Sequence, residues 1–270
     1  MTTLRVALIQ LCSTEDIAAN LCQINEIATE AVAAGAELLC LPENATWLRT
    51  HTHDRHGGHP LAGHPGVNGV ATIATTLGCP ILLGSALIGE LEAPRASNSS
   101  FLLDAGGAVL ARYDKIHLFQ VDLGPGTQFD ESQRVQAGHE PVIADFGGFR
   151  FGLTVCYDLR FSELYRHLAR AGANVLFVPS AFTVRTGQAH WHTLLRARAI
   201  ENQTYVLAPA QAGEHGGGRA SFGHTIAFDP WGDVLGERSS EPGFVLVELD
   251  AARIDDVRRA LPSHAHHVLG

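Results

Sequence analysis

Lysine is almost absent from this sequence of 270 residues, which carries eighteen arginines and a single lysine, Lys115. A chain that uses arginine for nearly every positive charge keeps a lysine where a flat guanidinium cannot replace a compact ammonium. The alternative is chance, with Lys115 an ordinary charged residue at the surface. The scarcity makes Lys115 a candidate functional residue, and its neighbours must decide between the two interpretations.

Charged residues of all kinds are also scarce, at 17% of the chain, and the formal net charge is -9. The arginines are scattered without a dense basic run, which argues against a nucleic-acid partner. No apolar stretch approaches the roughly 20 residues that span a bilayer, so we expect no membrane partner. Met1–Gln10 has the pattern of a strand and lacks the layout of a signal peptide. Together these observations predict a cytoplasmic protein.

The cysteines lack the patterns of a disulfide framework or a zinc ribbon. Their number is odd, their spacing is wide, and no two of them form a Cys-x-x-Cys pair. We therefore expect reduced thiols, as is usual in a cytosolic chain. Most free cysteines are small core residues, so a catalytic role must be argued separately for each of Cys12, Cys22, Cys40, Cys79 and Cys156.

Hydrophobic residues make up 46% of the chain, enough to bury a sizeable core. A strand at Leu4–Leu11, a helix at about Glu15–Ala34 and a buried strand at Ala36–Leu41 predict a parallel strand pair with a right-handed crossover. Turn signals at 104–107 and 147–148 predict antiparallel hairpins. This mixture favours an α/β fold in which two mixed sheets pack together between outer helices, a four-layer αββα sandwich. No boundary interrupts the chain, so residues 1–270 are expected to form one domain.

Two segments are predicted to be loops. Asp114–His139 has the composition of a long ordered loop, and loops of that length in compact domains are usually functional. Gly213–Gly218 is rich in glycine but lacks the strand-to-helix pattern of a phosphate-binding loop. We expect it to be a flexible loop near the functional site.

Three residues with reactive side chains follow predicted strands directly: Glu43, Lys115 and Cys156. Ligands of α/β folds gather at the carboxyl ends of strands, so these residues can meet in one pocket. Taken alone, Glu43 could be an acid at a helix N-terminus and Cys156 a core thiol. The shared position at strand ends weakens both of these alternatives.

A carboxylate, an ammonium and a thiol are the groups that cleavage of an amide requires. A free thiol is mostly protonated at neutral pH, so a base such as Glu43 must take its proton. Attack on the amide carbon leaves negative charge on the carbonyl oxygen, which Lys115 and the Tyr157 backbone N–H could stabilise. Glu43 then protonates the leaving ammonia and deprotonates the water that hydrolyses the thioester. The sequence thus predicts a thiol hydrolase that cleaves a carbon–nitrogen bond.

Three segments in the same order resemble the signature regions of the nitrilase (carbon–nitrogen hydrolase) superfamily, and they lie at Leu41–Asn44, Tyr113–Phe119 and Gly152–Asp158. The resemblance extends over nearly the whole chain. It implies the αββα sandwich, a catalytic triad of Glu43, Lys115 and Cys156, no cofactor, and a homodimer or higher oligomer. It also implies a second acid, matched by Glu131, that orients Lys115 or assists proton transfer.

Further segments are similar to the amidase branch that contains the deaminated-glutathione amidases and omega-amidases, namely Pro179–Phe182, Leu195–Glu201 and Arg219–His224. This resemblance implies hydrolysis of a small carboxylate-bearing amide, with omega-amidase and N-carbamoyl amidase as alternative activities. Carbamoyl-amino-acid hydrolases carry an arginine at the position of Arg160 that holds a carboxylate; a structural salt bridge is the alternative. His192 replaces a glutamate that is frequent in this branch, which makes it a candidate substrate-binding residue.

Two other classes of function remain open from the residues alone. A Cys–His thiol transferase is possible because fifteen histidines are available, and it would place a histidine against the Cys156 sulfur. A metal-binding protein could be built on the histidines after Glu43. We favour a polar lid over a metal site for this segment, because no ordered ligand pattern joins His51, His53, His56, His59 and His64.

Overall fold

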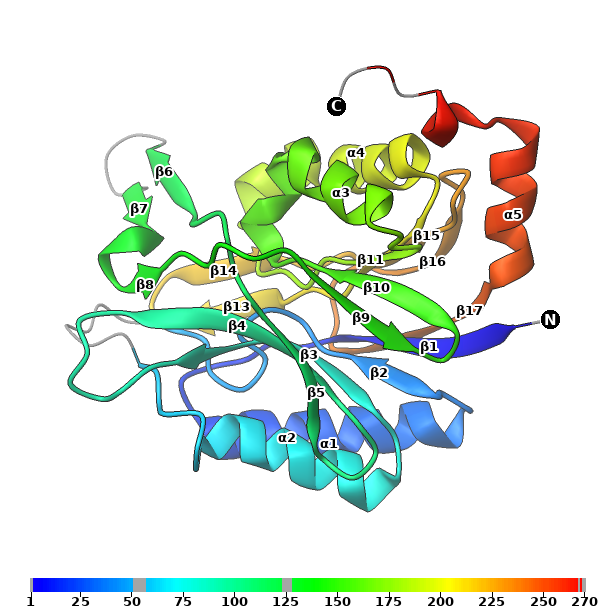
Figure 1. Ribbon diagram of the computed structural model, residues 1–270. Coiled ribbons are helices and arrows are strands. Elements are labelled where there is room, and N and C mark those ends of the chain that lie inside the picture. Colours follow the sequence, from blue (N-terminus) through cyan, green and yellow to red (C-terminus); the bar gives the residue numbers. More distant parts are fainter. Residues whose placement is uncertain (1, 51–56, 123–127, 267, 269–270) are drawn as a thin grey trace.

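The computed structural model describes residues 2–50, 57–122, 128–266 and 268. Two β-sheets face each other, and helices cover the outer face of each sheet (Figure 1). Helices α1 (Ile17–Ala33) and α2 (Pro65–Leu77) lie on the first sheet, while α3 (Ser162–Arg170) and α4 (Val184–Asn202) lie on the second. The four-layer αββα sandwich expected from the sequence is confirmed. Among the described residues, no helix is long and apolar enough to cross a membrane.

The first sheet is mixed. β1 (Thr3–Gln10) pairs in parallel with β2 (Leu38–Cys40) through Val6 and Leu38, as expected for strands joined by helix α1. On its other side, β1 pairs antiparallel with β17 (Gly243–Asp250). β8 (Val135–Gln136) pairs with β4. The remaining strands lie in the order β17 (Gly243–Asp250), β1 (Thr3–Gln10), β2 (Leu38–Cys40), β3 (Ile81–Ile88), β4 (Ala96–Leu103) and β5 (Val109–Asp114).

The second sheet is mixed as well. Its central strands β10 (Phe149–Leu153), β11 (Val175–Phe177) and β12 (Tyr205–Ala208) are parallel, and an antiparallel strand flanks them on each side, β9 beside β10 and β15 beside β12. Helix α5 (Ala251–Ala260) follows β17 near the C-terminus. The strands lie in the order β16 (Val234–Arg238), β15 (Thr225–Phe228), β12 (Tyr205–Ala208), β11 (Val175–Phe177), β10 (Phe149–Leu153) and β9 (Val142–Phe146).

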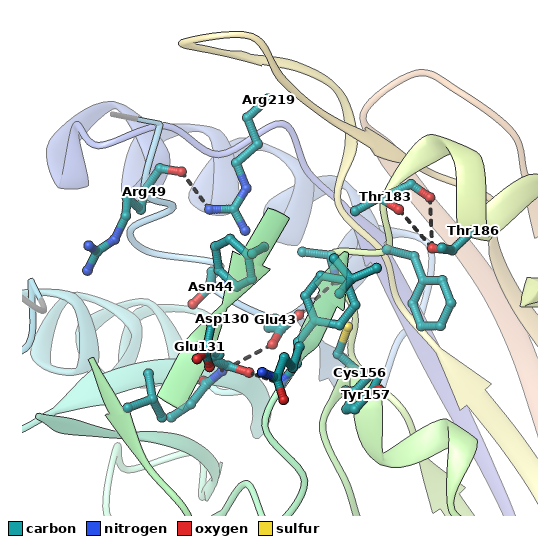
Figure 2. Close-up of a pocket in the computed structure, with 18 of the residues that line it drawn as sticks. Glu43, Asn44, Arg49, Asp130, Glu131, Cys156, Tyr157, Thr183, Thr186 and Arg219 are labelled. Carbon is teal, nitrogen blue, oxygen red and sulfur yellow. Dashed lines mark hydrogen bonds between the residues drawn. The ribbon is translucent and has the colours of Figure 1, made fainter. Parts of the chain in front are cut away.

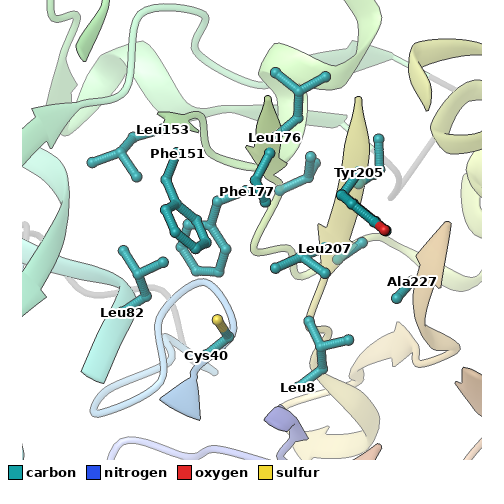
Figure 3. Packing of buried hydrophobic residues seen from close by; sticks show 14 of the residues in the cluster. Leu8, Cys40, Leu82, Phe151, Leu153, Leu176, Phe177, Tyr205, Leu207 and Ala227 are labelled. Atoms are coloured by element: carbon teal, nitrogen blue, oxygen red, sulfur yellow. The ribbon is translucent and has the colours of Figure 1, made fainter. Parts of the chain in front are cut away.

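The core consists of two hydrophobic layers because strand side chains alternate between faces. Along β1, Val6 and Leu8 pack toward the second sheet, whereas Ala7 and Ile9 pack toward the helices α1 and α2. Figure 3 shows Leu8 and other side chains of the first sheet against those of the second sheet. Burial on both faces explains why the first strands contain nearly continuous hydrophobic runs.

The two expected loops contain short strands. Gly213–Gly218 belongs to a hairpin of β13 (Ala212–Gly216) and β14 (Arg219–Phe222), so the expectation of a flexible loop was wrong, whereas its expected place near the functional site is correct. Gly217 and Gly218 have positive φ and form its tight turn. The segment Asp114–His139 contains β6 (Gln120–Asp122), β7 (Gln128–Asp130) and β8. Because these strands are short and polar, the sequence predicts loops in both segments.

Candidate active site

A cavity of about 1410 Å³ opens where the predicted site residues meet (Figure 2). Glu43, Lys115 and Cys156 all line it, and each follows the end of a strand: β2, β5 or β10. β2 and β5 run in the same direction within the first sheet, so their carboxyl ends lie at the same edge. Glu131 begins a 3₁₀ turn after β7 and also lines the cavity. The structure thus brings all four predicted residues together.

Lys115 is buried between two carboxylates. Its Nζ lies 3.0 Å from Glu43 Oε1 and 2.9 Å from Glu131 Oε2, and the residue is only 1% exposed. Burial alone would lower the pKa of Lys115, but the charges of Glu131 and Glu43 outweigh it and raise that pKa well above its ordinary value. The only lysine is therefore a fixed ammonium inside the cavity, and the chance interpretation of a surface residue does not hold.

Glu43 is ionised by the same pairing. Burial tends to raise the pKa of Glu43, but Lys115, a hydrogen bond from Cys156 and the Ala181 N–H lower it below its usual value. The Ala181 N–H donates to Glu43 Oε2 at 3.0 Å. Glu43 lies in a turn well before the next helix, α2, so it is not an acid at a helix N-terminus. Its carboxylate can accept the proton of the Cys156 thiol.

Hydrogen bonds and one close backbone contact hold the turn that carries Glu43 in place. The Asn44 N–H donates to Ser85 Oγ at 2.9 Å, and Gln211 Nε2 donates to the Glu43 carbonyl at 3.0 Å. Gly84 of β3 lies against the backbone of Leu41 and Pro42, where a Cβ atom would collide with both residues. Only glycine permits this close approach, and it fixes the position of the following carboxylate.

Cys156 has a strained backbone and a protonated thiol. Its φ is +50, a conformation that costs non-glycine residues energy and often marks functional sites. Its N–H donates to the Pro179 carbonyl at 2.9 Å, which holds this turn against the end of β11. Burial and the Glu43 charge raise the pKa of the Cys156 thiol well above its ordinary value. The resting thiol therefore needs a base to become a nucleophile.

Glu43, Lys115 and the Ala181 N–H are among the groups that act on the Cys156 thiol. In the described part of the chain, no hydrogen bond joins a histidine to the Cys156 sulfur, which argues against the Cys–His thiol transferase. His64 of the histidine-rich segment accepts hydrogen bonds at Nδ1 from the N–H groups of Gly66 and Val67 and so caps helix α2. The expected polar lid or metal site involves residues 51–56, which lie outside the described residues.

Asn98 is a site residue that the sequence analysis missed. Its Nδ2 donates to Glu43 Oε1 at 3.0 Å and to Glu131 Oε1 at 3.2 Å, and its backbone carbonyl accepts from the Lys115 N–H at 2.9 Å. Its buried Oδ1 has no hydrogen-bond partner among the described residues. Asn98 fixes both carboxylates around the ammonium. The sequence contains one indication of this role: Asn98 is an amide within a buried strand, β4, and that strand pairs with β5, which directly precedes Lys115.

Asp158 joins the cysteine turn to the lysine segment. Its Oδ2 accepts from the Tyr113 hydroxyl and the Val155 N–H, both at 2.8 Å. Its Oδ1 accepts from the His117 N–H at 3.0 Å and lies 2.7 Å from His117 Nδ1. Asp158 is fully buried, and its partners lie on either side of Lys115 and just before Cys156. This contact was also missed, although both sides belong to motifs identified in the sequence.

Replacing Asp158 with asparagine is expected to destabilise the protein. Asparagine keeps one acceptor oxygen in place of two, so either the Val155 N–H or the His117 N–H loses its acceptor. An unsatisfied buried donor costs about 1–3 kcal/mol. Chemical denaturation measures the change, and Tyr113→Phe is the matched control because it removes one donor and leaves the carboxylate in place. A denaturation midpoint for Asp158→Asn equal to that of the wild type would contradict this linking role.

The remaining predicted residues separate into two groups. Tyr157 and Arg160 line the cavity, and the Tyr157 N–H has no hydrogen-bond partner among the described residues. The Arg160 guanidinium lies over the rings of Tyr157 and Phe182, at 5.7 and 5.5 Å from their centroids. His192 does not line the cavity and pairs with Glu237, with Nε2 2.9 Å from Oε1. The structure therefore does not bring His192 to the predicted substrate site.

Comparison with known proteins gives the same class of chemistry. Residues 5–259 match the family described as carbon-nitrogen hydrolase. A protein of Synechocystis sp. named deaminated glutathione amidase is 41% identical over 265 residues, which cover 97% of this chain and 97% of that protein.

Two solved structures share the fold. The NitFhit protein of C. elegans superposes with a TM-score of 0.91 at 32% identity, over 99% of this chain and 66% of that one. An amidase of Nesterenkonia sp., from the nitrilase superfamily, has a TM-score of 0.74 at 28% identity, over 96% of this chain and 98% of that one. In that structure acrylamide has undergone Michael addition at the active-site cysteine. The present chain belongs to the carbon–nitrogen hydrolase family of the nitrilase superfamily, and it is a hydrolase that acts on amides.

Proposed function

We propose that Cys156 is the nucleophile, Glu43 the general base and acid, and Lys115 the oxyanion donor in the hydrolysis of a small carboxylate-bearing amide to acid and ammonia. The observation that carries the proposal is the buried Lys115 ammonium between Glu43 and Glu131, with Cys156 lining the same cavity. Residues 1–270 act as one catalytic domain.

The reaction begins with proton transfer from the Cys156 thiol to Glu43, because burial keeps the thiol protonated. The thiolate attacks the amide carbon and forms a tetrahedral intermediate. An ammonium has three N–H donors, and Glu43 and Glu131 each occupy one at Lys115. The third donor and the Tyr157 N–H hold the oxyanion.

Collapse of the intermediate breaks the carbon–nitrogen bond and leaves a thioester on Cys156. Glu43 returns its proton to the departing nitrogen, so ammonia leaves as a neutral molecule. Glu43 then deprotonates a water molecule that attacks the thioester, and the thiol recovers the proton as the acid departs. Glu131 stays ionised and orients Lys115, since its Oε2 also accepts from the Phe119 N–H at 2.7 Å.

The cavity supports a substrate with carboxylate groups. Its lining includes five arginines, which outnumber the acidic residues besides Glu43 and Glu131: Arg49, Arg134, Arg160, Arg185 and Arg219 against Asp122 and Asp130. Its volume exceeds the 300–1,000 Å³ of typical ligand pockets, so a peptide-sized amide can enter. Deaminated glutathione, which gives the similar proteins their name, is the substrate we propose. Omega-amidase and N-carbamoyl amidase activities are the alternatives.

A substrate panel tests this assignment. Ammonia release is measured with deaminated glutathione, ω-monoamides of dicarboxylic acids, N-carbamoyl amino acids and neutral amides of similar size. We expect the highest kcat/KM for deaminated glutathione and the lowest for the neutral amides. Preference for a neutral amide would contradict a carboxylate-binding cavity, and preference for another carboxylate-bearing amide would replace the proposed substrate.

Replacing Arg160 with lysine is expected to raise KM for carboxylate-bearing amides by on the order of tenfold, because a bidentate contact becomes a single one. Neutral amides should keep their KM. Steady-state kinetics with one substrate of each kind measures the difference, and Arg170→Lys serves as the matched control, because Arg170 is exposed on α3 and does not line the cavity. Equal losses for charged and neutral substrates would mean that Arg160 only packs against Tyr157 and Phe182.

We also propose a homodimer or higher oligomer in the cytoplasm. The five cysteines are unpaired, as is usual for a cytosolic chain. Ile200 and Trp231 are about half exposed, and Gly232 brings the turn after β15 against the Ile200 side chain. Adjacent exposed hydrophobic residues often mark an interface.

Sedimentation should therefore give at least twice the chain mass of 28.9 kDa. Trp231→Glu should lower that value, because a charge at the patch opposes its burial. A monomeric wild type would contradict the oligomer, and a Trp231→Glu variant that stays oligomeric would place the interface elsewhere.

A further inference from the structure

Three metal-ligating side chains meet outside the active-site cavity. His192 comes from α4, His224 from the turn between β14 and β15, and Glu237 from β16. Their ligand atoms all lie within 4.8 Å of one another. Glu237 Oε1 is 2.9 Å from His192 Nε2 and 2.6 Å from His224 Nδ1. Two imidazoles from separate elements thus converge on one carboxylate oxygen.

The backbone holds His224 in place for this arrangement. Its φ of +57 lies in the left-handed region, which is uncommon for a residue other than glycine. Its N–H donates to the Ser239 carbonyl at 2.8 Å, and its carbonyl accepts from Trp191 Nε1 at 2.8 Å. Its ring stacks on Phe222, with centroids 4.3 Å apart and planes 25° apart. Contacts on the backbone and on one ring face therefore fix the direction of Nδ1.

We propose that His192, His224 and Glu237 form a binding site for a zinc-type divalent transition metal. Two imidazoles and one carboxylate suit zinc, whereas calcium and magnesium prefer sites made only of oxygen ligands. Tetrahedral zinc with bonds near 2.0–2.1 Å places its ligand atoms about 3.3 Å apart. The three side chains reach that spacing by small rotations, since two of the separations are now hydrogen-bond lengths. Water completes the coordination because the cluster is partly exposed.

The metal would join three elements that otherwise meet through hydrogen bonds and ring contacts. Helix α4 begins at Val184, and its first residues Val184, Arg185 and Thr186 line the cavity. Arg185 precedes His192 by seven residues, so the two lie on the same face of the helix, about 10 Å apart along its axis. The ion would anchor this helix face to β16. The amide hydrolysis proposed above needs nothing from it.

Metal binding is tested with the full-length protein after treatment with a chelator. Zinc affinity is measured by competition with a chromogenic chelator, and cobalt serves as a spectroscopic probe of the ligands. We expect one tight site that raises the melting temperature of the wild type. His192→Gln, His224→Asn and Glu237→Gln should each weaken it at least tenfold and remove the stabilisation. His224→Asn uses a residue that tolerates positive φ.

The control is His167→Gln, which changes an exposed histidine of α3 and should leave zinc affinity unaltered. Circular dichroism and melting without metal establish that each variant folds. If a histidine variant does not fold, Glu237→Gln decides alone, because it changes an exposed side chain. Zinc affinity equal to that of the wild type in the three cluster variants would overturn the proposal and place the metal on other histidines. The absence of any site with dissociation constant below the millimolar range would also overturn it.

Discussion

Replacing Cys156 with serine is expected to lower kcat by at least about a thousandfold, close to complete loss of turnover. The Glu43 carboxylate can take a proton from a thiol, but a hydroxyl is a much weaker acid and remains protonated in the same buried position. With a slow substrate, intact-mass analysis of the wild type should show an acyl adduct, and peptide mapping should place it on Cys156. The adduct would report the thioester directly.

Cys12→Ser is the matched control for this prediction. Cys12 is the thiol with a histidine neighbour, since its Sγ lies 3.7 Å from His215 Nδ1. Burial lowers the pKa of His215 to about 4 and raises the pKa of Cys12, so the two do not form a thiolate–imidazolium pair at neutral pH. Cys12→Ser should keep wild-type kcat. An adduct on Cys12, or on Cys22, Cys40 or Cys79, would contradict the assignment of Cys156.

The sequence predicts the parts of the site that depend on strand ends. Glu43 and Cys156 each follow a hydrophobic, buried strand, and Lys115 follows a partly exposed edge strand. Strands that run in the same direction bring their carboxyl ends to one edge. Their meeting in one cavity follows from that topology. The roles of all three, and of Glu131 and Arg160, stay predictions until variants are measured.

The supporting contacts could not be predicted in the same way. Asn98 lies in β4, whose polar side chains give no indication of which loop they face, and Asp158 reaches Tyr113 across 45 residues. Such contacts depend on how the two sheets pack, which local periodicity does not encode. For His192, the sequence predicts a contact with the substrate site that the structure does not contain. Its replacement of a glutamate that is frequent in the amidase branch predicts substrate binding, but the helix turns its side chain toward Glu237.

Because Lys115 is buried, its replacement with arginine should affect stability as well as activity. Lys115 donates to Glu43 at 3.0 Å and to Glu131 at 2.9 Å, and only 1% of the residue is exposed. A guanidinium is larger and planar, so it must displace one carboxylate or crowd Cys156. Overpacking of this kind costs about 1–3 kcal/mol of stability. Kinetics must therefore be measured well below the melting temperature of the variant.

Under those conditions kcat of Lys115→Arg should fall by roughly a hundred- to a thousandfold, the effect of losing one oxyanion donor. Lys115→Met separates geometry from charge, because it keeps the length of the side chain and removes the ammonium. If position matters, as we expect, both variants lose activity, since the arginine charge cannot donate along the required line. If charge alone matters, the arginine variant keeps more than about a tenth of wild-type kcat while the methionine variant does not. That second outcome would mean that Lys115 only balances Glu43 and Glu131, and the Tyr157 N–H would then be the principal oxyanion donor.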